Sequence, residues 1–306
     1  MSDTQETVQT AEKQSRERLI VISVLVIVAA LIGGYYLSTA LIPTPKIGVL
    51  RVQSQVSGLL AEVMAREITY ARENDDIKGI VMIINSPGGG AASGHDIYYQ
   101  VRKLREEKPI VASMDSLAAS AAYQIGVGAN EIYAKPATFV GNVGVITGLG
   151  QPETLSEQFI TTGPFKTTGG SPTSFLQKLD LLHADFRDSV VAERQNAPNP
   201  LKITPEQLAT GEIWVGIEAK EYGLIDEIGS VIDATDRVAE LAGLRNYEVV
   251  DIREEVLADL QESSEAKYEA MEELYAELDA QPEEFDITAA ENSQWPTFYE
   301  IYIPLE

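Results

Sequence analysis

Two stretches of the chain combine residue types that can carry out acyl transfer, and the first is NSPGGG at residues 85–90. It follows a β-branched run, and its three glycines let a ligand approach the backbone closely. Backbone N–H groups in such a turn can bind a phosphate or a developing oxyanion. The stretch matches neither a Walker loop nor a dinucleotide fingerprint. It therefore predicts either an oxyanion site or an ordinary tight turn.

The second stretch is SLAASAAYQIG at residues 116–126, where a predicted strand gives way to a predicted helix. Ser120 opens that helix, so its hydroxyl lies at the positive end of the helix dipole. The N–H of Ala121, the next residue, can donate to an oxyanion. Ser120 is thus a candidate nucleophile. The alternative is a helix cap, or a small residue that permits close packing.

A nucleophilic serine needs a general base, and this chain offers few. It has no cysteine and two histidines, His95 and His183. His183 lies in LDLLHADF, within a predicted helix, where a surface or packing role explains it better. Lys166 lies in ITTGPFKTTGGSPTSF, a run with few charges, where burial could keep an amine neutral. Lys166 is therefore the better candidate for the base, against the default of an ordinary surface lysine.

Composition excludes several classes of protein. The chain has 306 residues with 47 acids and 23 bases, a formal net charge of -24, which repels phosphate and argues against nucleic-acid partners. The absence of cysteine removes disulfides and thiolate metal sites, and two histidines nearly exclude a multi-histidine site. We therefore expect no metal and no cofactor.

Strand and helix patterns alternate from residue 46 onward, which predicts a mostly parallel sheet with right-handed crossovers. This sheet must place residues 85–90 and residues 116–126 at the ends of strands. Strands are predicted at 46–52, 77–84, 109–115, 131–136 and 138–146, and helices at 57–73, 93–107, 116–129 and 174–195.

The N-terminal region contains an uncharged run at residues 19–42 that is long enough to cross a bilayer. Three basic residues precede it and two follow it, so the positive-inside rule places residues 1–18 in the cytoplasm. A cleaved secretory signal is the alternative, since Ser38 and Ala40 form a small-x-small pattern. The run is longer than a typical signal-peptide core, which favours a retained membrane anchor and an extracytoplasmic globular part.

The C-terminal region, residues 251–306, holds 17 acids and 2 bases, so it carries -15 of the net charge of -24. Residues 253–280 are predicted to form an acidic helix with a possible apolar stripe and a solvated face. The last stretch, QWPTFYEIYIPLE at 294–306, is aromatic and β-prone. We expect it to dock as a strand, either as an internal substrate mimic near the cleft or as an assembly clasp.

Taken in order, these motifs resemble the signal peptide peptidase A family of membrane serine proteases. The resemblance covers about residues 46–245 and rests on NSPGGG, the AAS that opens a small-residue helix, VGNVGVI, GPFK with TGGSP, and ATGEIWVGIEAKEYGLIDEIG. The glycine motif is shared with the Clp protease and crotonase folds. The resemblance therefore implies a Clp protease/crotonase-like parallel-sheet fold over 46–250, after a transmembrane helix and before an acidic helical tail.

The resemblance also implies a mechanism. Ser120 matches the family's nucleophile and Lys166 its general base, and Gly89 and Ala121 match the positions whose N–H groups form the oxyanion hole. Members of the family assemble as rings. This chain resembles the half-length members, which have a single repeat. In those members, neighbouring subunits can contribute the serine and the lysine of one active site. Apolar peptides such as residual signal peptides are the implied substrates, reached at the surface of the lipid bilayer.

Two departures from the family pattern stand beside these implications. Ala121 and Ala122 replace glycines after the serine, which could narrow the cleft. Asn142 replaces a serine that would orient the lysine, although its side-chain carbonyl can still accept a hydrogen bond from Lys166. We expect the distinctive residues of the last motif to shape a helix and a turn: Trp214, Gly216, Ala219, Gly223, Leu224, Asp226 and Gly229.

Three other functions remain open at this point. A related membrane Ser-Lys protease, of the kind that cleaves stomatins, would share the dyad and differ in substrate. A catalytically silent scaffold of this fold would never bring Ser120 and Lys166 together. A crotonase-like acyl-thioester enzyme would use the oxyanion hole without a nucleophile, but the predicted anchor and the Lys166 motif argue against it.

Overall fold

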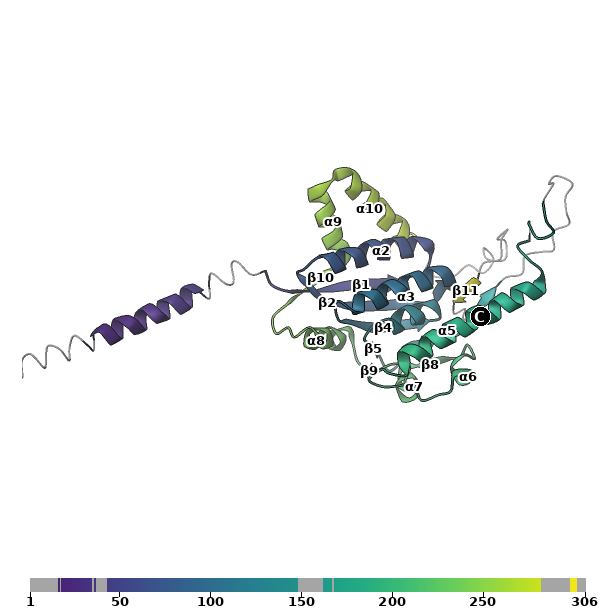
Figure 1. Cartoon of the computed structure of the whole chain (residues 1–306), viewed down its shortest axis with the longest axis horizontal. Coiled ribbons are helices and arrows are strands. Elements are labelled where there is room, and N and C mark those ends of the chain that lie inside the picture. Colours follow the sequence, from purple (N-terminus) through teal and green to yellow (C-terminus); the bar gives the residue numbers. More distant parts are fainter. Residues whose placement is uncertain are drawn as a thin grey trace, which may run out of the picture. The chain divides into compact units, whose positions relative to one another are not determined.

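The structure is a computed structural model that divides into two units, residues 1–44 and 45–306, which we describe separately (Figure 1). For residues 298–301 it describes the backbone alone. The described residues are 16, 18–34, 36, 43–147, 162–166, 168–281 and 298–301.

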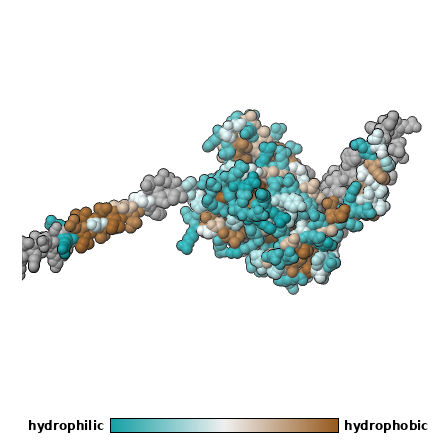
Figure 2. Space-filling view, in the orientation of Figure 1, coloured by the Kyte–Doolittle hydropathy of each residue, from teal (hydrophilic) through white to brown (hydrophobic). Residues whose placement is uncertain are grey.

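In the first unit, residues 18–34 form a helix whose side chains are exposed. Figure 2 shows that the surface of this helix is largely hydrophobic. Across the ranges that the structure describes, no helix combines the length and the apolar character needed to cross a membrane. Residue 35 and residues 37–42 of the predicted anchor lie outside the described residues.

The second unit is built on an eight-stranded, mostly parallel sheet, as the alternation of the sequence predicts. Six strands follow in the order β10-β1-β2-β4-β5-β9, and all their pairings are parallel. Strand β6 extends the sheet beside the end of β4 and carries β8 antiparallel to itself. The bounds are β1 (Lys46–Gln53), β2 (Ile77–Ser86), β4 (Ile110–Ala119), β5 (Glu131–Ala134), β6 (Phe139–Gly141), β8 (Ile213–Val215), β9 (Glu227–Ile228) and β10 (Glu248–Asp251).

Helices cover both faces of this sheet, which explains why its central strands are continuous apolar runs. One face packs on α2 (Gly58–Glu73), α3 (Ala91–Arg105) and α4 (Ala121–Val127). The other face packs on α8 (Val231–Leu241) and buries the smaller of the two hydrophobic clusters. The remaining helices of the core are α5 (Pro172–Arg194), α6 (Pro205–Leu208) and α7 (Gly216–Tyr222).

The sequence-based prediction of a helix over 116–129 is wrong at its start. Strand β4 continues to Ala119, because Leu117–Ala119 pair with β6, and the helix begins only at Ala121. The strand predicted at 138–146 is likewise two strands, β6 and the short β7 (Ile146–Thr147).

A second sheet of three strands lies at the glycine motif. Its order is β3-β11-β7, with β3 (Gly88–Gly90) and β7 both antiparallel to β11 (Phe298–Ile301). The strand predicted in the C-terminal stretch is therefore present over these four residues. The rest of that stretch, residues 294–297 and 302–306, lies outside the described residues.

The acidic region forms two helices instead of the single predicted one. Helix α9 (Ile252–Ser263) ends at Ser264, which is extended at φ -168°, and α10 (Glu265–Asp279) follows. Both helices pack on α2, and Met271 and Tyr275 are buried against the core. The apolar stripe therefore makes this region part of the second unit, while its acidic side chains face outward.

Candidate active site

Ser120 caps the N-terminus of α4 directly after β4, in the strand-to-helix position that the sequence predicts. Its backbone has φ 56° and ψ -125°, a strained conformation for a residue with a side chain. The Ser120 N–H donates to Gly141 O at 2.8 Å, which ties this turn to β6. Strain of this kind at a strand-to-helix turn is typical of a serine held for nucleophilic attack.

The Ser120 hydroxyl is buried and unpaired. The residue has no exposed surface, and its Oγ has no hydrogen-bond partner among the residues that the structure describes. A buried hydroxyl without a partner is costly in a folded protein and calls for a functional explanation. It is consistent with a nucleophile whose base is supplied from elsewhere.

The predicted oxyanion donors lie beside this serine. Ala121 is the first residue of α4, where backbone N–H groups have no partner within the helix. Gly89 is the middle residue of β3, a strand that contacts α4. A Cβ atom on Gly89 would lie 2.1 Å from Val56 O, so only glycine fits there.

The pairing of β3 fixes the direction in which Gly89 faces. Val56 N–H donates to Gly88 O at 2.8 Å, and Gly90 N–H donates to Val56 O at 2.8 Å. Since alternate residues of a strand direct their backbone groups to opposite edges, the Gly89 N–H faces away from Val56. It faces the edge at which an extended peptide could pair.

Lys166 has no described bond to Ser120, Ala121 or Gly89. It is exposed, in the described segment 162–166, and makes no hydrogen bond or ion pair with another described residue. Its neighbour Phe165 is also exposed, at 53%. The structure therefore does not join Lys166 to the Ser120 hydroxyl within one chain.

Asn142 has a structural role in the described residues. It adopts φ 56°, a left-handed conformation that asparagine tolerates. Its side-chain Nδ2 donates to Gly211 O at 2.7 Å, and its N–H donates to Glu212 O at 2.8 Å. These bonds hold the end of β6 to the segment before β8. The predicted bond from Lys166 is not among its described contacts.

The two histidines are held by other groups. His95 Nε2 lies 2.6 Å from Asp185 Oδ2, and Nδ1 lies 2.8 Å from Ala91 O. His183 Nε2 lies 2.9 Å from Ala209 O, which gives it a packing role. With both of its ring nitrogens already engaged, His95 is poorly placed to deprotonate Ser120.

Sequence reasoning missed Gln124, which follows Ser120 by one helical turn. It is fully buried, and its Nε2 lies 3.3 Å from His95 Nε2 and 3.3 Å from Ser189 Oγ. Its Oε1 has no partner among the described residues. The i, i+4 spacing from Ser120 was the only sequence signal for this residue.

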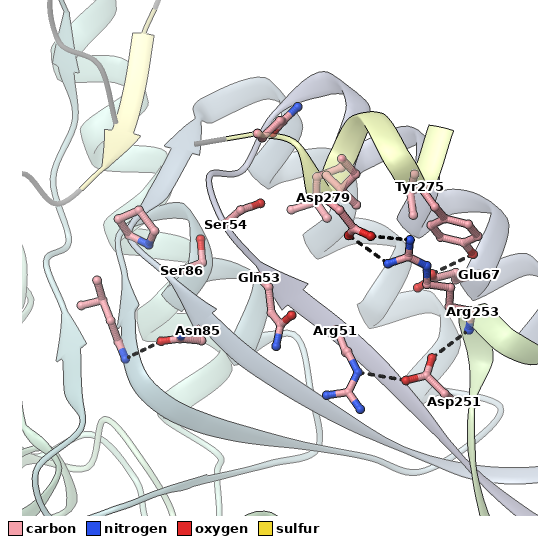
Figure 3. A pocket seen from close by; sticks show the side chains of 16 residues that line it. Arg51, Gln53, Ser54, Glu67, Asn85, Ser86, Asp251, Arg253, Tyr275 and Asp279 are labelled. Atoms are coloured by element: carbon pink, nitrogen blue, oxygen red, sulfur yellow. Dashed lines mark hydrogen bonds and ion pairs between the residues drawn. The ribbon is translucent and has the colours of Figure 1, made fainter. Parts of the chain in front are cut away.

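A cavity of about 430 Å³ lies between the ends of β1 and β2 and helix α10 (Figure 3). At one end Tyr275 donates to Glu67 at 2.9 Å, and the Arg253 guanidinium lies over the Tyr275 ring at 4.1 Å. Burial raises the pKa of the Glu67 carboxyl to about 7. The cavity reaches Ser86 and Pro87, just before β3, but Ser120 does not line it.

Nowhere in the described ranges do three side chains gather that could hold a metal ion.

The residues of the motif at 209–229 pack against the rest of the fold and form structural bonds. Asp226 pairs with Arg194 through two bonds of 2.8 Å, and both side chains are 3% exposed. Gly223 ends α7 in the left-handed conformation at φ 81°, where a Cβ would lie 2.1 Å from Pro200 O. A Cβ on Gly216 would lie 2.0 Å from Lys135 O.

Fold and site together define a class: a mixed α/β protein with a parallel sheet, in which a strained serine lies beside a glycine-lined strand. The Clp protease family model matches residues 45–138, and the model of peptidase family S49 matches residues 102–245. A candidate protease of Synechocystis sp. is 30% identical over 207 residues, which cover 62% of this chain and 73% of that protein. The chain belongs to peptidase family S49, the family of signal peptide peptidase A.

Other matches set the extent of this relationship. The chloroplastic serine protease SPPA of Arabidopsis thaliana is 28% identical over 190 residues, 57% of this chain and 28% of that protein. Among solved structures, a mutant of the 1510-N membrane-bound stomatin-specific protease is 18% identical, with a TM-score of 0.49 over 69% of this chain and 98% of that chain. The chain spans 61% of one curated relative and 28% to 32% of three longer ones.

Proposed function

We propose that the protein is a serine endopeptidase in which Ser120 is the nucleophile and Lys166 the general base. One observation carries this proposal: the buried hydroxyl of Ser120 has no hydrogen-bond partner among the described residues. It lies at a strained strand-to-helix turn, beside a glycine strand whose Gly89 N–H faces away from Val56. Membership of a peptidase family gives the reaction class.

The chemistry is acyl transfer. As the general base, Lys166 removes the proton from Ser120, and the resulting alkoxide attacks a peptide carbonyl. The N–H groups of Gly89 and Ala121 stabilise the oxyanion, each by about 3 kcal/mol. Lys166 then protonates the leaving amine, and water hydrolyses the acyl-enzyme.

In this proposal the lysine comes from a neighbouring copy of the chain. The Ser120 hydroxyl has no hydrogen-bond partner among the described residues of its own chain, and Lys166 is exposed with no described partner. A homo-oligomeric ring would place the Lys166 of one protomer beside the Ser120 of the next. The Clp protease match over residues 45–138 is consistent with such an assembly.

We also propose that residues 19–42 anchor the protein in the cytoplasmic membrane, with residues 1–18 in the cytoplasm and the peptidase unit outside. The run carries no charge, and its described part is helical with exposed apolar side chains. The proposed substrates are apolar peptides, such as residual signal peptides. Segments of other membrane proteins are the alternative substrates.

A catalytically silent scaffold is the second candidate, and the absence of a described bond between Lys166 and Ser120 favours it. The test measures hydrolysis of apolar fluorogenic peptides, and labelling by a fluorophosphonate, in the full chain in detergent. Ser120→Ala and Lys166→Met should each abolish both signals while the oligomer size is unchanged. A Lys166→Met protein with full activity would exclude the dyad, and a wild-type protein without either signal would favour the scaffold.

A further inference from the structure

Strand β1 has an open backbone edge beside the cavity of Figure 3. On one side, β1 pairs with β2 along its whole length, from Lys46 to Gln53. On the other side, β10 pairs only with residues 46–49 and ends at Asp251. No described strand continues this edge along residues 50–53, and no backbone bond joins it to another described segment. The edge therefore offers backbone N–H and C=O groups to a ligand.

Helices α9 and α10 form the opposite wall of the cavity. Arg253 belongs to α9, and Tyr275 and Leu278 belong to α10. At about 430 Å³, the cavity has the size of a site for a small ligand. The helical wall lies beyond residues 45–138 and 102–245, the ranges that the two family models match. The matched part of the chain therefore does not account for this cavity.

Arg51 brings an unpaired guanidinium edge to the cavity. Its Nε donates to Asp251 Oδ2 at 2.9 Å, and its two terminal nitrogens have no partner among the described residues (Figure 3). The side chain is 44% exposed, so a ligand can reach these nitrogens. Asp251 Oδ1 accepts from the Arg253 N–H at 3.1 Å, which holds the carboxylate that orients Arg51. A guanidinium held in this way matches the two oxygens of a ligand carboxylate.

The other arginine of the cavity is already paired. Arg253 donates to both oxygens of Asp279, at 2.9 and 2.7 Å, and its guanidinium lies over the Tyr275 ring. Of the cations that line the cavity in the described ranges, Arg51 is therefore the one that can receive an anion.

Polar side chains extend the site along the open edge. Gln53 and Asn85 are neighbours in the β1–β2 ladder, and neither side-chain amide nitrogen has an acceptor among the described residues. Ser54, the next residue, has φ 64°, a conformation that is uncommon for a residue with a side chain. Strained residues of this kind cluster at ligand sites. The amides suit the polar groups of a peptide backbone.

We propose that this cavity binds the carboxyl end of a short extended peptide. The terminal carboxylate pairs with Arg51, the peptide backbone adds as a strand to residues 50–53, and an apolar side chain packs on Tyr275 and Leu278. Ser120 does not line the cavity, so the site is separate from the candidate nucleophile. Binding here does not depend on the peptidase activity proposed above, and the two proposals can fail independently.

The test titrates two ligands into the full chain in detergent by isothermal titration calorimetry. One is an acetylated tripeptide of alanine, valine and leucine with a free carboxylate, and the other is its C-terminal carboxamide. The proteins are the wild type, Arg51→Gln and Arg66→Gln. Arg66 is the matched control, because its exposed ion pair with Glu62 on α2 has the same chemistry and does not line the cavity. Hydrogen exchange at residues 50–54 locates the bound peptide.

The carboxylate peptide should bind the wild type and Arg66→Gln equally, and Arg51→Gln at least about tenfold more weakly. The carboxamide should bind the wild type at least about tenfold more weakly than the carboxylate does, a comparison that needs no variant. Exchange at residues 50–54 should slow when the carboxylate peptide is bound.

Equal affinity for carboxylate and carboxamide would overturn the role of Arg51. Binding that slows exchange at residues 88–90 and not at 50–54 would place the peptide at the candidate active site and overturn the cavity as its site. No binding at about 5 mM peptide would overturn the proposal as a whole. Exchange at residues 50–54 that slows with protein concentration alone would assign the open edge to a second copy of the chain.

Discussion

The strained backbone of Ser120 ties its position to function at the scale of one residue. The conformation at φ 56° and ψ -125° costs about 1–3 kcal/mol for a residue with a Cβ, and it holds the hydroxyl between β4 and α4. An alanine at position 120 would have the same backbone strain, whereas a glycine would not. Both replacements remove the hydroxyl, so comparing them separates the effect of the strain on stability from the loss of catalysis.

We expect Ser120→Gly to be more stable than Ser120→Ala by about 1 kcal/mol, because glycine adopts positive φ without strain. Both variants should lose peptide hydrolysis and fluorophosphonate labelling. Thermal and denaturant unfolding measure the difference in stability. Equal stability of the two variants would show that the turn at residue 120 is not strained.

Gly89 allows a second test at this scale. Gly89→Ala would place a Cβ 2.1 Å from Val56 O and should push β3 off Val56. Hydrolysis should fall about a hundredfold or more, the order found for a lost oxyanion donor. Gly90→Ala is the matched variant, since its Cβ would meet nothing closer than 3.7 Å, and it should cost far less. Similar losses in both variants would argue against the close approach at Gly89.

At the scale of elements, the buried Glu67 couples α2 to α10. Tyr275 donates to the Glu67 carboxyl at 2.9 Å, and burial raises the pKa of that carboxyl from 4.5 to about 7. Between about pH 4.5 and 7 the folded protein keeps this proton and the unfolded chain loses it. Stability from this group is therefore present at low pH and is lost as pH rises through about 7, by about 3 kcal/mol in all.

Glu67→Gln should remove this dependence, because the amide stays neutral and can still accept from Tyr275. The free energy of unfolding of the variant minus that of the wild type should increase by about 3 kcal/mol from pH 5 to pH 8.5. Denaturant unfolding of both proteins at each pH measures this difference. The comparison between the two proteins cancels the titration of the other carboxyl groups. A difference that does not change with pH would place the Glu67 pKa at its ordinary value.

At the scale of the whole molecule, the proposed site needs two copies of the chain. Ser120 and Lys166 have no described contact within one protomer, and each would find its partner across an interface. Such a head-to-tail interface closes into a ring when the rotation between copies is right.

Co-expression of Ser120→Ala and Lys166→Met chains should restore hydrolysis that neither variant has alone. In a mixed ring, a Ser120 from one chain meets a Lys166 from the other at about a quarter of the interfaces, so about a quarter of the wild-type rate should return. The purified single variants, mixed without co-assembly, are the control. No recovery in mixed rings of confirmed composition would mean that each protomer supplies both groups.

The sequence by itself determined the local features: the β-branched run of β2, the glycines of β3, the serine between a strand and a helix, and the aromatic stretch that contains β11. Each of these follows from the conformational preferences of neighbouring residues and from the chemistry of the residue itself.

Only the tertiary structure decided what these segments meet. Leu117–Ala119 are strand because they pair with β6, and the acidic helices dock because α2 offers an apolar face. The pairing of β11 with Gly89 has the same physical origin. Pairing between distant segments depends on edges and surfaces that exist only after the sheet has formed, and no local pattern of residues encodes them.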